Sequence, residues 1–273
     1  MNDPSTAVRA CAISSLVPLL RHEPAHAVAL FERALDGHEA LLRCQPTQRF
    51  LYHAYQSYFP RLRRFIEAMM VQEEEATRQS GAALACLASF ASPAAQDLAQ
   101  SALCGGAILR RGAAQVYARN LANGRLEQKC LAQLGRLLND DDPQVRESIG
   151  DCFRHLRAEH VFRLRDFIQH FLESRALVEG AYNLIQYLKP YLAQERQLGL
   201  DAVERVLQMM GDEVMDVRTA SALMQKDLVQ ITLTVYAHSK EAGERERAMD
   251  LFEQLLARGS PAAVTALQEY DRQ

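Results

Sequence analysis

The feature that most constrains this chain is a helical corner at residues 140–146, spelled Asp-Asp-Asp-Pro-Gln-Val-Arg. Asp142 is a favourable N-cap, and Pro143 fits the first helical position, where a missing N–H costs no hydrogen bond. Apolar residues then fall on one face at helical spacing, at Val145, Ile149, Cys152, Phe153 and Leu156. The stretch 126–138 before the corner carries a similar apolar stripe. The sequence therefore predicts helix, acidic turn and helix, with Val145 packed inward and Arg146 paired with a carboxylate of a neighbouring turn.

Copies of this corner occur elsewhere in the chain. Two of them keep the acidic residue and the Val-Arg pair, and they consist of Asp3, Pro4, Val8 and Arg9, and of Asp212, Val217 and Arg218. The stretches 73–78 and 109–111 are weaker copies. The three Val-Arg pairs are 137 and 72 residues apart, close to multiples of about 35–47 residues, the length of a helical-pair repeat. One hairpin cannot bury its apolar face alone, so we expect the hairpins to stack on one another.

These corners resemble the turn of the HEAT repeat, in which Asp-Pro precedes a Val-Arg pair and an alanine-rich second helix. The resemblance implies an all-α chain folded as a right-handed α-solenoid of stacked antiparallel helix pairs, HEAT- or armadillo-like. Few glycines (13), few prolines (9) and a lack of strand-like alternation favour the same class. We expect about thirteen helices in a single array over residues 1–273, with a new helix starting at Pro60 and one helix covering 161–172.

The chain opens directly on the corner at Asp3 and Pro4. In a HEAT unit this turn lies between the first and the second helix, so the first helix of the opening unit is missing. We therefore expect the chain to be a C-terminal fragment of a longer protein. A short protein with an incomplete first unit is the alternative.

Composition narrows the class of protein. The net charge is −3, less basic than is usual for a general nucleic-acid binder, and only four of the 31 basic residues are lysines. The six cysteines form no C-x-x-C pair, which indicates free thiols and a reducing, cytoplasmic location. No signal peptide is visible, and no apolar run reaches the ~20 residues that a membrane span needs.

Motifs for catalysis are missing from the sequence. Cys152 and His155 are three residues apart, but a buried cysteine beside a surface histidine explains this spacing better than a nucleophile does. His155, His160 and His170 are scattered without metal-ligand spacing. Gly105-Gly106 lacks a following lysine and is interpreted as a helix break. We expect no enzymatic activity, no catalytic residue, no cofactor and no metal.

Two acidic runs, Asp140–Asp142 and Glu73–Glu75, lie at predicted helix N-termini. Carboxylates there stabilise the helix dipole, and we favour this interpretation over a cation site. An aromatic stripe is predicted to belong to the core because it has the period of a buried helix face, and it comprises Phe50, Tyr55, Tyr58 and Phe59.

Arginines form the main candidate binding surface. The first arginine group lies within twelve residues and comprises Arg154, Arg157, Arg163 and Arg165. The second arginine group comprises Arg61, Arg63 and Arg64. Such groups could contact phosphates or an acidic protein surface. The favoured alternative is a solvated face in which the arginines pair with carboxylates such as Asp151, Glu159 and Asp166.

A second resemblance covers nearly the whole chain through dispersed positions. This chain is similar to the C-terminal helical region of large bacterial ATP-binding proteins of the STAND NTPase type in the stretches 8–11, 16–20, 27–31, 110–118, 140–146, 152–154 and 250–271. Several relatives of that type act in antiviral defence. The resemblance implies a ligand-sensing repeat region, and no ATPase activity, because the nucleotide-binding motifs of the family are absent here.

The sequence therefore predicts a non-enzymatic scaffold that binds a macromolecule, most simply a protein, as the sensor of a larger bacterial NTPase switch. A stand-alone adaptor that joins two proteins is the alternative. A HEAT-like DNA-binding or DNA-repair enzyme is disfavoured, because the chain is net acidic and contains no tryptophan. Nucleic acid is thus not the favoured partner, and a membrane is not expected.

Overall fold

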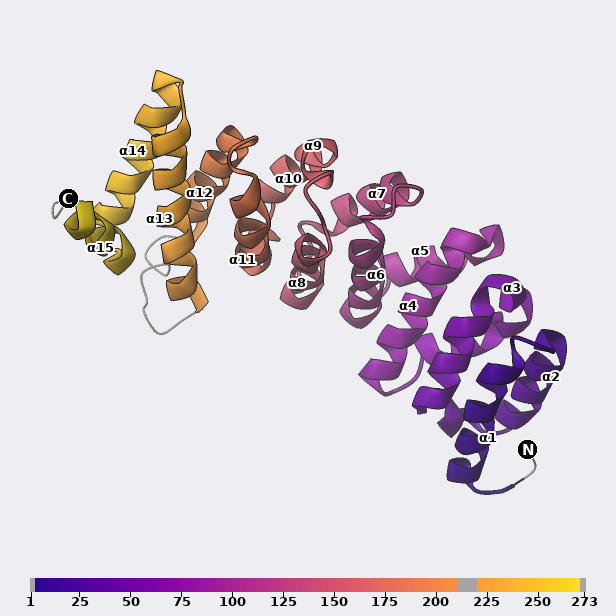
Figure 1. Ribbon diagram of the computed structural model, residues 1–273. Coiled ribbons are helices and arrows are strands. Elements are labelled where there is room, and N and C mark those ends of the chain that lie inside the picture. The colour runs from indigo at the N-terminus through magenta and orange to yellow at the C-terminus, as the bar shows by residue number, and fades with distance from the viewer. Residues whose placement is uncertain (1–2, 211–219, 271–273) are drawn as a thin grey trace. The chain divides into compact units, whose positions relative to one another are not determined.

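A computed structural model describes residues 3–210 and 220–270, and within these ranges every regular element is helical and no strand occurs. The all-α class is thereby confirmed. The repeat copy at Asp212, Val217 and Arg218 lies outside the described residues. The described part contains fifteen α-helices (Figure 1): α1 Thr6–Leu19, α2 Pro24–Leu35, α3 Gln45–Met70, α4 Glu75–Ala91, α5 Gln96–Cys104, α6 Ala107–Asn120, α7 Glu127–Leu137, α8 Pro143–Gly150, α9 His160–Arg163, α10 Arg165–Leu172, α11 Leu177–Leu188, α12 Arg196–Met210, α13 Ala220–His238, α14 Ala242–Ala257 and α15 Pro261–Tyr270. Four short 3-10 helices complete these ranges: η1 Glu39–Arg43, η2 Pro93–Ala95, η3 Asp151–Arg154 and η4 Lys189–Tyr191.

The expected number of about thirteen helices is therefore wrong. One difference lies at 161–172, where a single helix was expected and the backbone leaves helical geometry at Leu164 (φ −102°, ψ 12°) between α9 and α10. The expected boundary at Pro60 coincides with a kink, because α3 consists of two helical segments that meet just before this residue. The ring of a proline clashes with the preceding turn, and here Tyr58 takes up the distortion with non-helical angles (φ −125°, ψ 19°). Helix boundaries thus differ from the expectation where a single residue breaks the pattern.

Contacts between Cα atoms divide the chain into two compact units, unit 1 (Met1–Tyr117) and unit 2 (Ala118–Gln273). In unit 1, α1 packs on α2 and α3, and α4 packs on α3 and α5. Its aromatic core centres on Phe31, whose ring stacks on that of Phe50 at 4.1 Å and meets the edge of Phe65 at 5.5 Å. Of the predicted aromatic stripe, Phe50, Tyr55 and Phe59 are buried and Tyr58 is half-buried, so the core interpretation is confirmed for three of the four.

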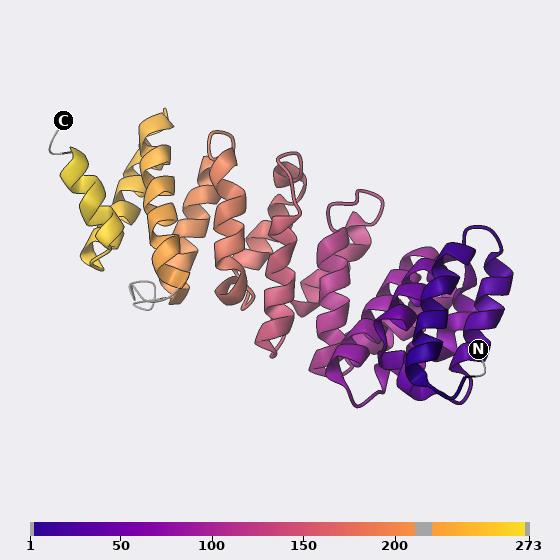
Figure 2. The ribbon, with the colours of Figure 1, turned by 60° about the horizontal axis from the view of Figure 1, so that its bottom comes forward.

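Helices of unit 2 alternate between two rows (Figures 1 and 2). In the first row, α7 contacts α10, α10 contacts α12 and α12 contacts α14. In the second row, α8 contacts α11, α11 contacts α13 and α13 contacts α15. Helices adjacent in the sequence, such as α11 and α12, contact each other across the rows. Each hairpin of this unit thus contributes one helix to each row.

Glycine permits the closest approach in the second row. A Cβ atom on Gly150 of α8 would lie 2.6 Å from the Cα atom of Gly180 in α11. A Cβ atom on Gly180 would in turn lie 2.5 Å from the ring of Phe171. Both distances are far shorter than any contact between carbon atoms that are not bonded, so the backbones of α8 and α11 touch directly and leave no room for a side chain.

Candidate interaction surface

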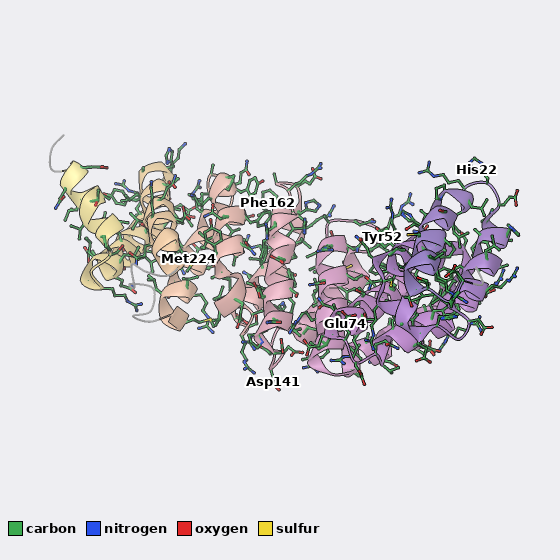
Figure 3. The ribbon with its side chains drawn as sticks, turned by 90° about the horizontal axis from the view of Figure 1, so that it is seen from below. His22, Tyr52, Glu74, Asp141, Phe162 and Met224 are labelled. Atoms are coloured by element: carbon green, nitrogen blue, oxygen red, sulfur yellow. The ribbon has the colours of Figure 1, made fainter. Side chains whose placement is uncertain are left out.

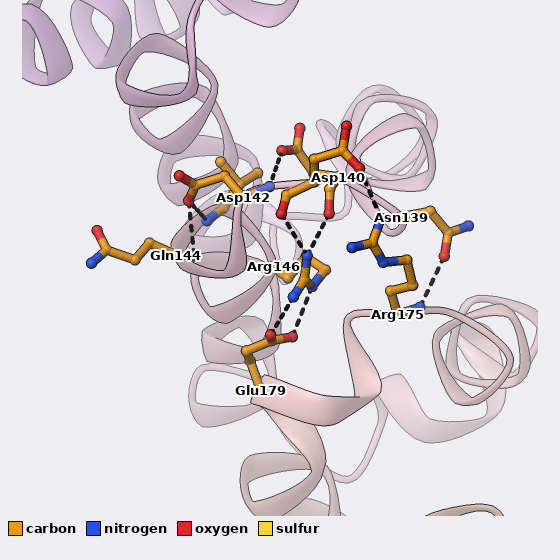
Figure 4. Close-up of polar contacts among 9 residues, drawn as sticks. Asn139, Asp140, Asp142, Gln144, Arg146, Arg175 and Glu179 are labelled. Carbon is orange, nitrogen blue, oxygen red and sulfur yellow. Dashed lines mark hydrogen bonds and ion pairs between the residues drawn. The ribbon is translucent and has the colours of Figure 1, made fainter. Parts of the chain in front are cut away.

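The predicted corner at residues 140–146 is closed by polar contacts (Figure 4). The carboxylate of Asp142 accepts hydrogen bonds from the backbone N–H groups of Gln144 (2.9 Å) and Val145 (3.1 Å), which confirms its N-cap role. Arg146 donates to the carbonyl oxygens of Asp140 (2.6 Å) and Asp141 (3.1 Å). We call this arrangement, in which an arginine holds carbonyls five or six residues earlier, the arginine clamp.

Arg146 also reaches the next hairpin. Its guanidinium meets both carboxylate oxygens of Glu179, at 2.5 and 2.9 Å, in the first turn of α11 (Figure 4). The expected pairing with the carboxylate of a neighbouring turn is thus confirmed. The side chains of Arg146 and Glu179 are only 9% and 17% exposed, so the pair is largely shielded from water. The hydrogen bonds from Arg146 hold its own corner and join α8 to α11.

The arginine clamp recurs in the three other predicted copies of the corner that lie within the described residues. Each of the three further clamps spans five or six residues: Arg9 donates to Asp3 (2.5 Å), Arg78 donates to Gln72 and Glu73 (2.8 Å each), and Arg110 donates to Gly105 (2.6 Å). The copies at 73–78 and 109–111 therefore close in the same way as the stronger ones. These arginines have a structural role, and the break at Gly105-Gly106 supplies a carbonyl for one of them.

The two acidic runs are occupied by local contacts. Asp141 pairs with Arg175 at 2.8 Å, and Asp140 accepts a hydrogen bond from the backbone N–H of Asp142 at 2.9 Å. In the other run, Glu74 accepts a hydrogen bond from the hydroxyl of Thr77 at 2.6 Å. In the ranges 3–210 and 220–270, no group of three His, Cys, Asp or Glu side chains is arranged to hold a metal ion.

The remaining candidates for chemistry are a cysteine and two histidines of unit 2. Cys152 is fully buried, and burial raises the pKa of its thiol, whereas His155 is exposed. This is the buried cysteine beside a surface histidine that the sequence favoured. His160 is buried, and its ring nitrogens lie 2.9 Å from the backbone nitrogen of Arg157 and 3.3 Å from the carbonyl of Ala122. A buried thiol with a raised pKa lacks the electropositive, partly exposed setting that a reactive thiolate needs, and the ring of His160 is held by backbone groups.

The first arginine group is spread over several elements of unit 2. Arg154 lies 3.5 Å from Asp151 in η3, and Arg163 pairs with Glu127 of α7 at 2.5 Å. Arg165 lies 3.6 Å from Glu195, which directly precedes α12. The guanidinium of Arg157 forms no ion pair within the described part of the chain. Arg163 and Arg165 therefore point to different neighbouring helices and do not form one cluster.

The second arginine group links helices of unit 1. Arg61 pairs with Glu32 of α2, and Arg63 pairs with Asp97 of α5 at 2.5 Å. The guanidinium of Arg63 lowers the pKa of the Asp97 carboxyl through their hydrogen bond. The guanidinium carbon of Arg64 lies 4.6 Å from the ring centroid of Phe65, a cation–π contact. Each arginine of this group thus has a partner within unit 1.

The two arginine groups contain copies of one motif that our sequence analysis missed. Residues 61–66 are spelled Arg-Leu-Arg-Arg-Phe-Ile and residues 163–168 Arg-Leu-Arg-Asp-Phe-Ile, 102 residues apart. In both copies the first arginine pairs with a carboxylate earlier in the chain and the second with a later one. The leucine, phenylalanine and isoleucine of both copies are buried. The two words agree at five of six positions and differ only at Arg64 and Asp166, so the signal is visible when one mismatch is allowed.

The copies differ at the residue before the motif. Pro60 occupies this position in unit 1, whereas Phe162 occupies it in unit 2 with 62% of its surface exposed. In Figure 3, Phe162 and Asp141 lie at opposite edges of unit 2. Phe162 lines a shallow cavity of about 270 Å³ together with Arg165, Gln194, Glu195, Arg196, Gln197 and Glu244. An aromatic side chain is therefore presented to solvent beside two guanidinium groups.

In this cavity the carboxylates are buried more deeply than the guanidinium groups. The side chains of Glu195 and Glu244 are 5% and 13% exposed, whereas that of Arg165 is 45% exposed. Hydrogen bonds from the Ser239 hydroxyl (2.6 Å) and from Arg196 (2.8 Å) lower the pKa of the Glu244 carboxyl. Buried carboxylates thus hold guanidinium groups that face outward. The distance of 3.6 Å from Arg165 to Glu195 is too long for a hydrogen bond, which leaves N–H donors of Arg165 for a partner.

Comparisons with family models, with curated proteins and with solved structures found no match to this chain. Among the described helices, none combines the length and the apolar character that crossing a bilayer requires.

Proposed function

We propose that the chain is a non-enzymatic binding module, a HEAT-like α-solenoid that holds a protein partner on the surface around Phe162 and Arg165. The recurring arginine clamp supports the repeat assignment, because four corners close by the same bonds. The alternation of helices between two rows in unit 2 supports the stacking of hairpins.

The observation that carries the binding proposal is the contrast between the two motif copies. Both copies use their arginines to join helices, but only the second places a large aromatic side chain in solvent. Burial of an exposed phenylalanine releases about 1.5–3 kcal/mol, so a protein partner that covers Phe162 gains a substantial part of its affinity there. Arginine and aromatic residues are enriched at the centres of protein interfaces.

The test begins with a photo-crosslinking phenylalanine analogue at position 162, introduced into the protein in its source cells. A second analogue at Tyr182, an aromatic residue of α11 that is 45% exposed, serves as the matched control. We expect one protein to be crosslinked from position 162 and not from position 182. The affinity of that purified partner is then measured for the wild type and for Phe162→Ala, Arg165→Glu and Tyr182→Ala.

Phe162→Ala and Arg165→Glu are expected to weaken binding at least tenfold, and Tyr182→Ala to leave the affinity unchanged. The far-UV circular dichroism of all variants should match the wild type, because each replaced side chain is largely exposed. Equal crosslinking from both positions, or an unchanged affinity of Phe162→Ala, would refute the proposed surface. Crosslinking to nucleic acid instead of protein would contradict the proposed class of partner.

We further propose that this module is the sensor part of a bacterial NTPase switch of the STAND type, as its sequence resemblance implies. Partner binding would then shift the balance between two states of the nucleotide-binding part through different affinities for those states. The upstream sequence of the reading frame tests this assignment. An in-frame nucleotide-binding module supports the switch, and a stop codon directly ahead of Met1 supports the stand-alone adaptor.

A further inference from the structure

A groove on each side of α10 forms a second surface in unit 2, separate from the cavity at Phe162. Three residues line both grooves: Asp166 and His170 of α10, and Glu173, which directly follows the helix. The groove toward α7 has a volume of about 520 Å³, and the groove toward α12 and α14 has a volume of about 440 Å³. Neither shares a lining residue with the Phe162 cavity. Helix α10 therefore separates the two grooves, and we call the line of Asp166, His170 and Glu173 between them the ridge.

The groove between α7 and α10 has an apolar floor. Leu131 and Leu138 contribute to it from the α7 side and Phe167 from the α10 side. Gly135 of α7 lies between the two leucines, and a Cβ atom there would meet no heavy atom within 4 Å. At Gly135 the groove therefore has room for a side chain of a bound partner, in contrast to the tightly packed Gly150.

Negative charge prevails along the ridge. The carboxylates of Asp166 and Glu173 form no ion pair or hydrogen bond with the described residues. Beyond them, Asp201 and Glu204 share a single guanidinium, that of Arg247. The second guanidinium of the groove, Arg205, donates to the carbonyl of Leu172 at 3.1 Å. The lining of this groove thus holds four carboxylates and two guanidinium groups.

Spacing along α10 defines the partner more closely. Asp166 and Glu173 are seven residues apart, which corresponds to about 10 Å along a helix and to the same face. A second helix lying beside α10 would match these carboxylates with cations that are also one heptad apart. Its apolar side chains, at the intervening helical positions, would enter the groove above Phe167 and Gly135.

We propose that the α7–α10 groove binds an amphipathic helix that carries lysine or arginine side chains seven residues apart beside an apolar stripe. The apolar floor accepts the stripe, and the carboxylates of Asp166 and Glu173 select for the cations and for their spacing. This site is distinct from the Phe162 surface, because the two share no lining residue.

The probe is a synthetic helical peptide with an apolar stripe and two lysines one heptad apart, studied by fluorescence anisotropy with the full chain. Matched peptides carry glutamates in place of the lysines, or place the lysines on the opposite face. We expect saturable binding of the first peptide, weakened by salt, and at least tenfold weaker binding of both matched peptides.

Protein variants locate the site. Gly135→Arg fills the groove and introduces a positive charge, and Asp166→Lys with Glu173→Lys reverses the ridge; each is expected to weaken binding at least tenfold. Gly135→Ala fits the open space, Glu147→Lys reverses an exposed charge of α8 outside the groove, and Phe162→Ala alters the other surface. These three controls should bind the peptide as the wild type does.

Three results would overturn the proposal. The first is no peptide binding by the wild type at millimolar concentration, and the second is equal binding of the lysine and glutamate peptides. The third is unchanged affinity of Gly135→Arg when its circular dichroism and melting temperature equal those of the wild type. A loss of binding in Phe162→Ala alone would assign the peptide to the other surface and would likewise refute the groove.

Discussion

Removal of the Arg146 guanidinium tests the corner most directly. Arg146→Met keeps an apolar stem of similar length but removes hydrogen bonds to two backbone carbonyls and to both oxygens of Glu179. The partner carboxylate then remains 17% exposed without its cation. Loss of one member of a fully buried ion pair costs about 3–5 kcal/mol, and water still reaches Glu179, so we expect a loss of about 2–3 kcal/mol in unfolding free energy.

A nearby surface pair provides the matched control. Arg175 and Asp141 form an ion pair at the same corner, but their side chains are 55% and 95% exposed. Exposed pairs contribute about 0–1 kcal/mol, so Arg175→Met should cost less than about 1 kcal/mol. Urea unfolding followed by far-UV circular dichroism gives the unfolding free energy of both variants, provided that the slope of the transition is unchanged.

A double-mutant cycle separates the pair from the clamp. Glu179→Met alone leaves a guanidinium without its carboxylate, whereas the double variant leaves no unpaired charge at this position. We expect the double variant to be more stable than the sum of the single losses predicts, by about 1–2 kcal/mol, because a removed partner accounts for much of each single loss. Strict additivity, or a loss below about 0.5 kcal/mol in Arg146→Met, would refute the argument that a shielded pair joins α8 to α11.

Three further predictions concern packing, pH and reactivity. Gly150→Ala should destabilise the protein by about 1–3 kcal/mol in thermal melts through overpacking, whereas Gly135→Ala should stabilise it by about 0.5–1 kcal/mol through helix propensity; the opposite order would contradict the contact between α8 and α11. The folded-state pKa of Glu244 lies below its unfolded value of 4.5. The stability that Glu244 contributes is therefore present above pH 4.5 and is lost as the pH falls through the folded-state pKa. In urea titrations at a series of pH values, Glu244→Gln should remove that part of the acid dependence. In the folded protein at pH 8, iodoacetamide should label the exposed Cys11 and not Cys152, as mass spectrometry of the digested protein can show; rapid labelling of Cys152 would mean that its burial is not maintained in solution.

The corner was predictable from the sequence because its contacts are local. Asp142, Pro143, Val145 and Arg146 lie within five residues, and each follows a rule for helix N-termini or helix faces. The core interpretation of the aromatic stripe succeeded for the same reason, since periodicity alone identifies a buried helix face. The all-α class followed from many such local signals that agreed with one another.

The candidate surface was less predictable because its geometry depends on partners far away in the sequence. Closeness in the sequence grouped Arg163 with Arg165, but the carboxylates that they meet are far away. Glu127 precedes Arg163 by 36 residues, and Glu195 follows Arg165 by 30 residues. The helix breaks at Leu164 after the single turn of α9, and the exposed Phe162 lies in that turn. An apolar pattern cannot reveal this break, because leucine itself is a good helix former.

The arginine clamp also has a consequence for how such a chain can change over evolutionary time. Because the bonds of each clamp lie within seven or fewer consecutive residues, a hairpin that is duplicated or deleted takes its own clamp with it. Contacts such as that between Arg146 and Glu179 are different, since they require matching residues on both sides of a junction. A corner can thus be exchanged for another corner, whereas a junction cannot be exchanged without its partner residue. The two Arg-Leu-Arg copies are 102 residues, or about three repeat lengths, apart, which fits the duplication of a block of hairpins.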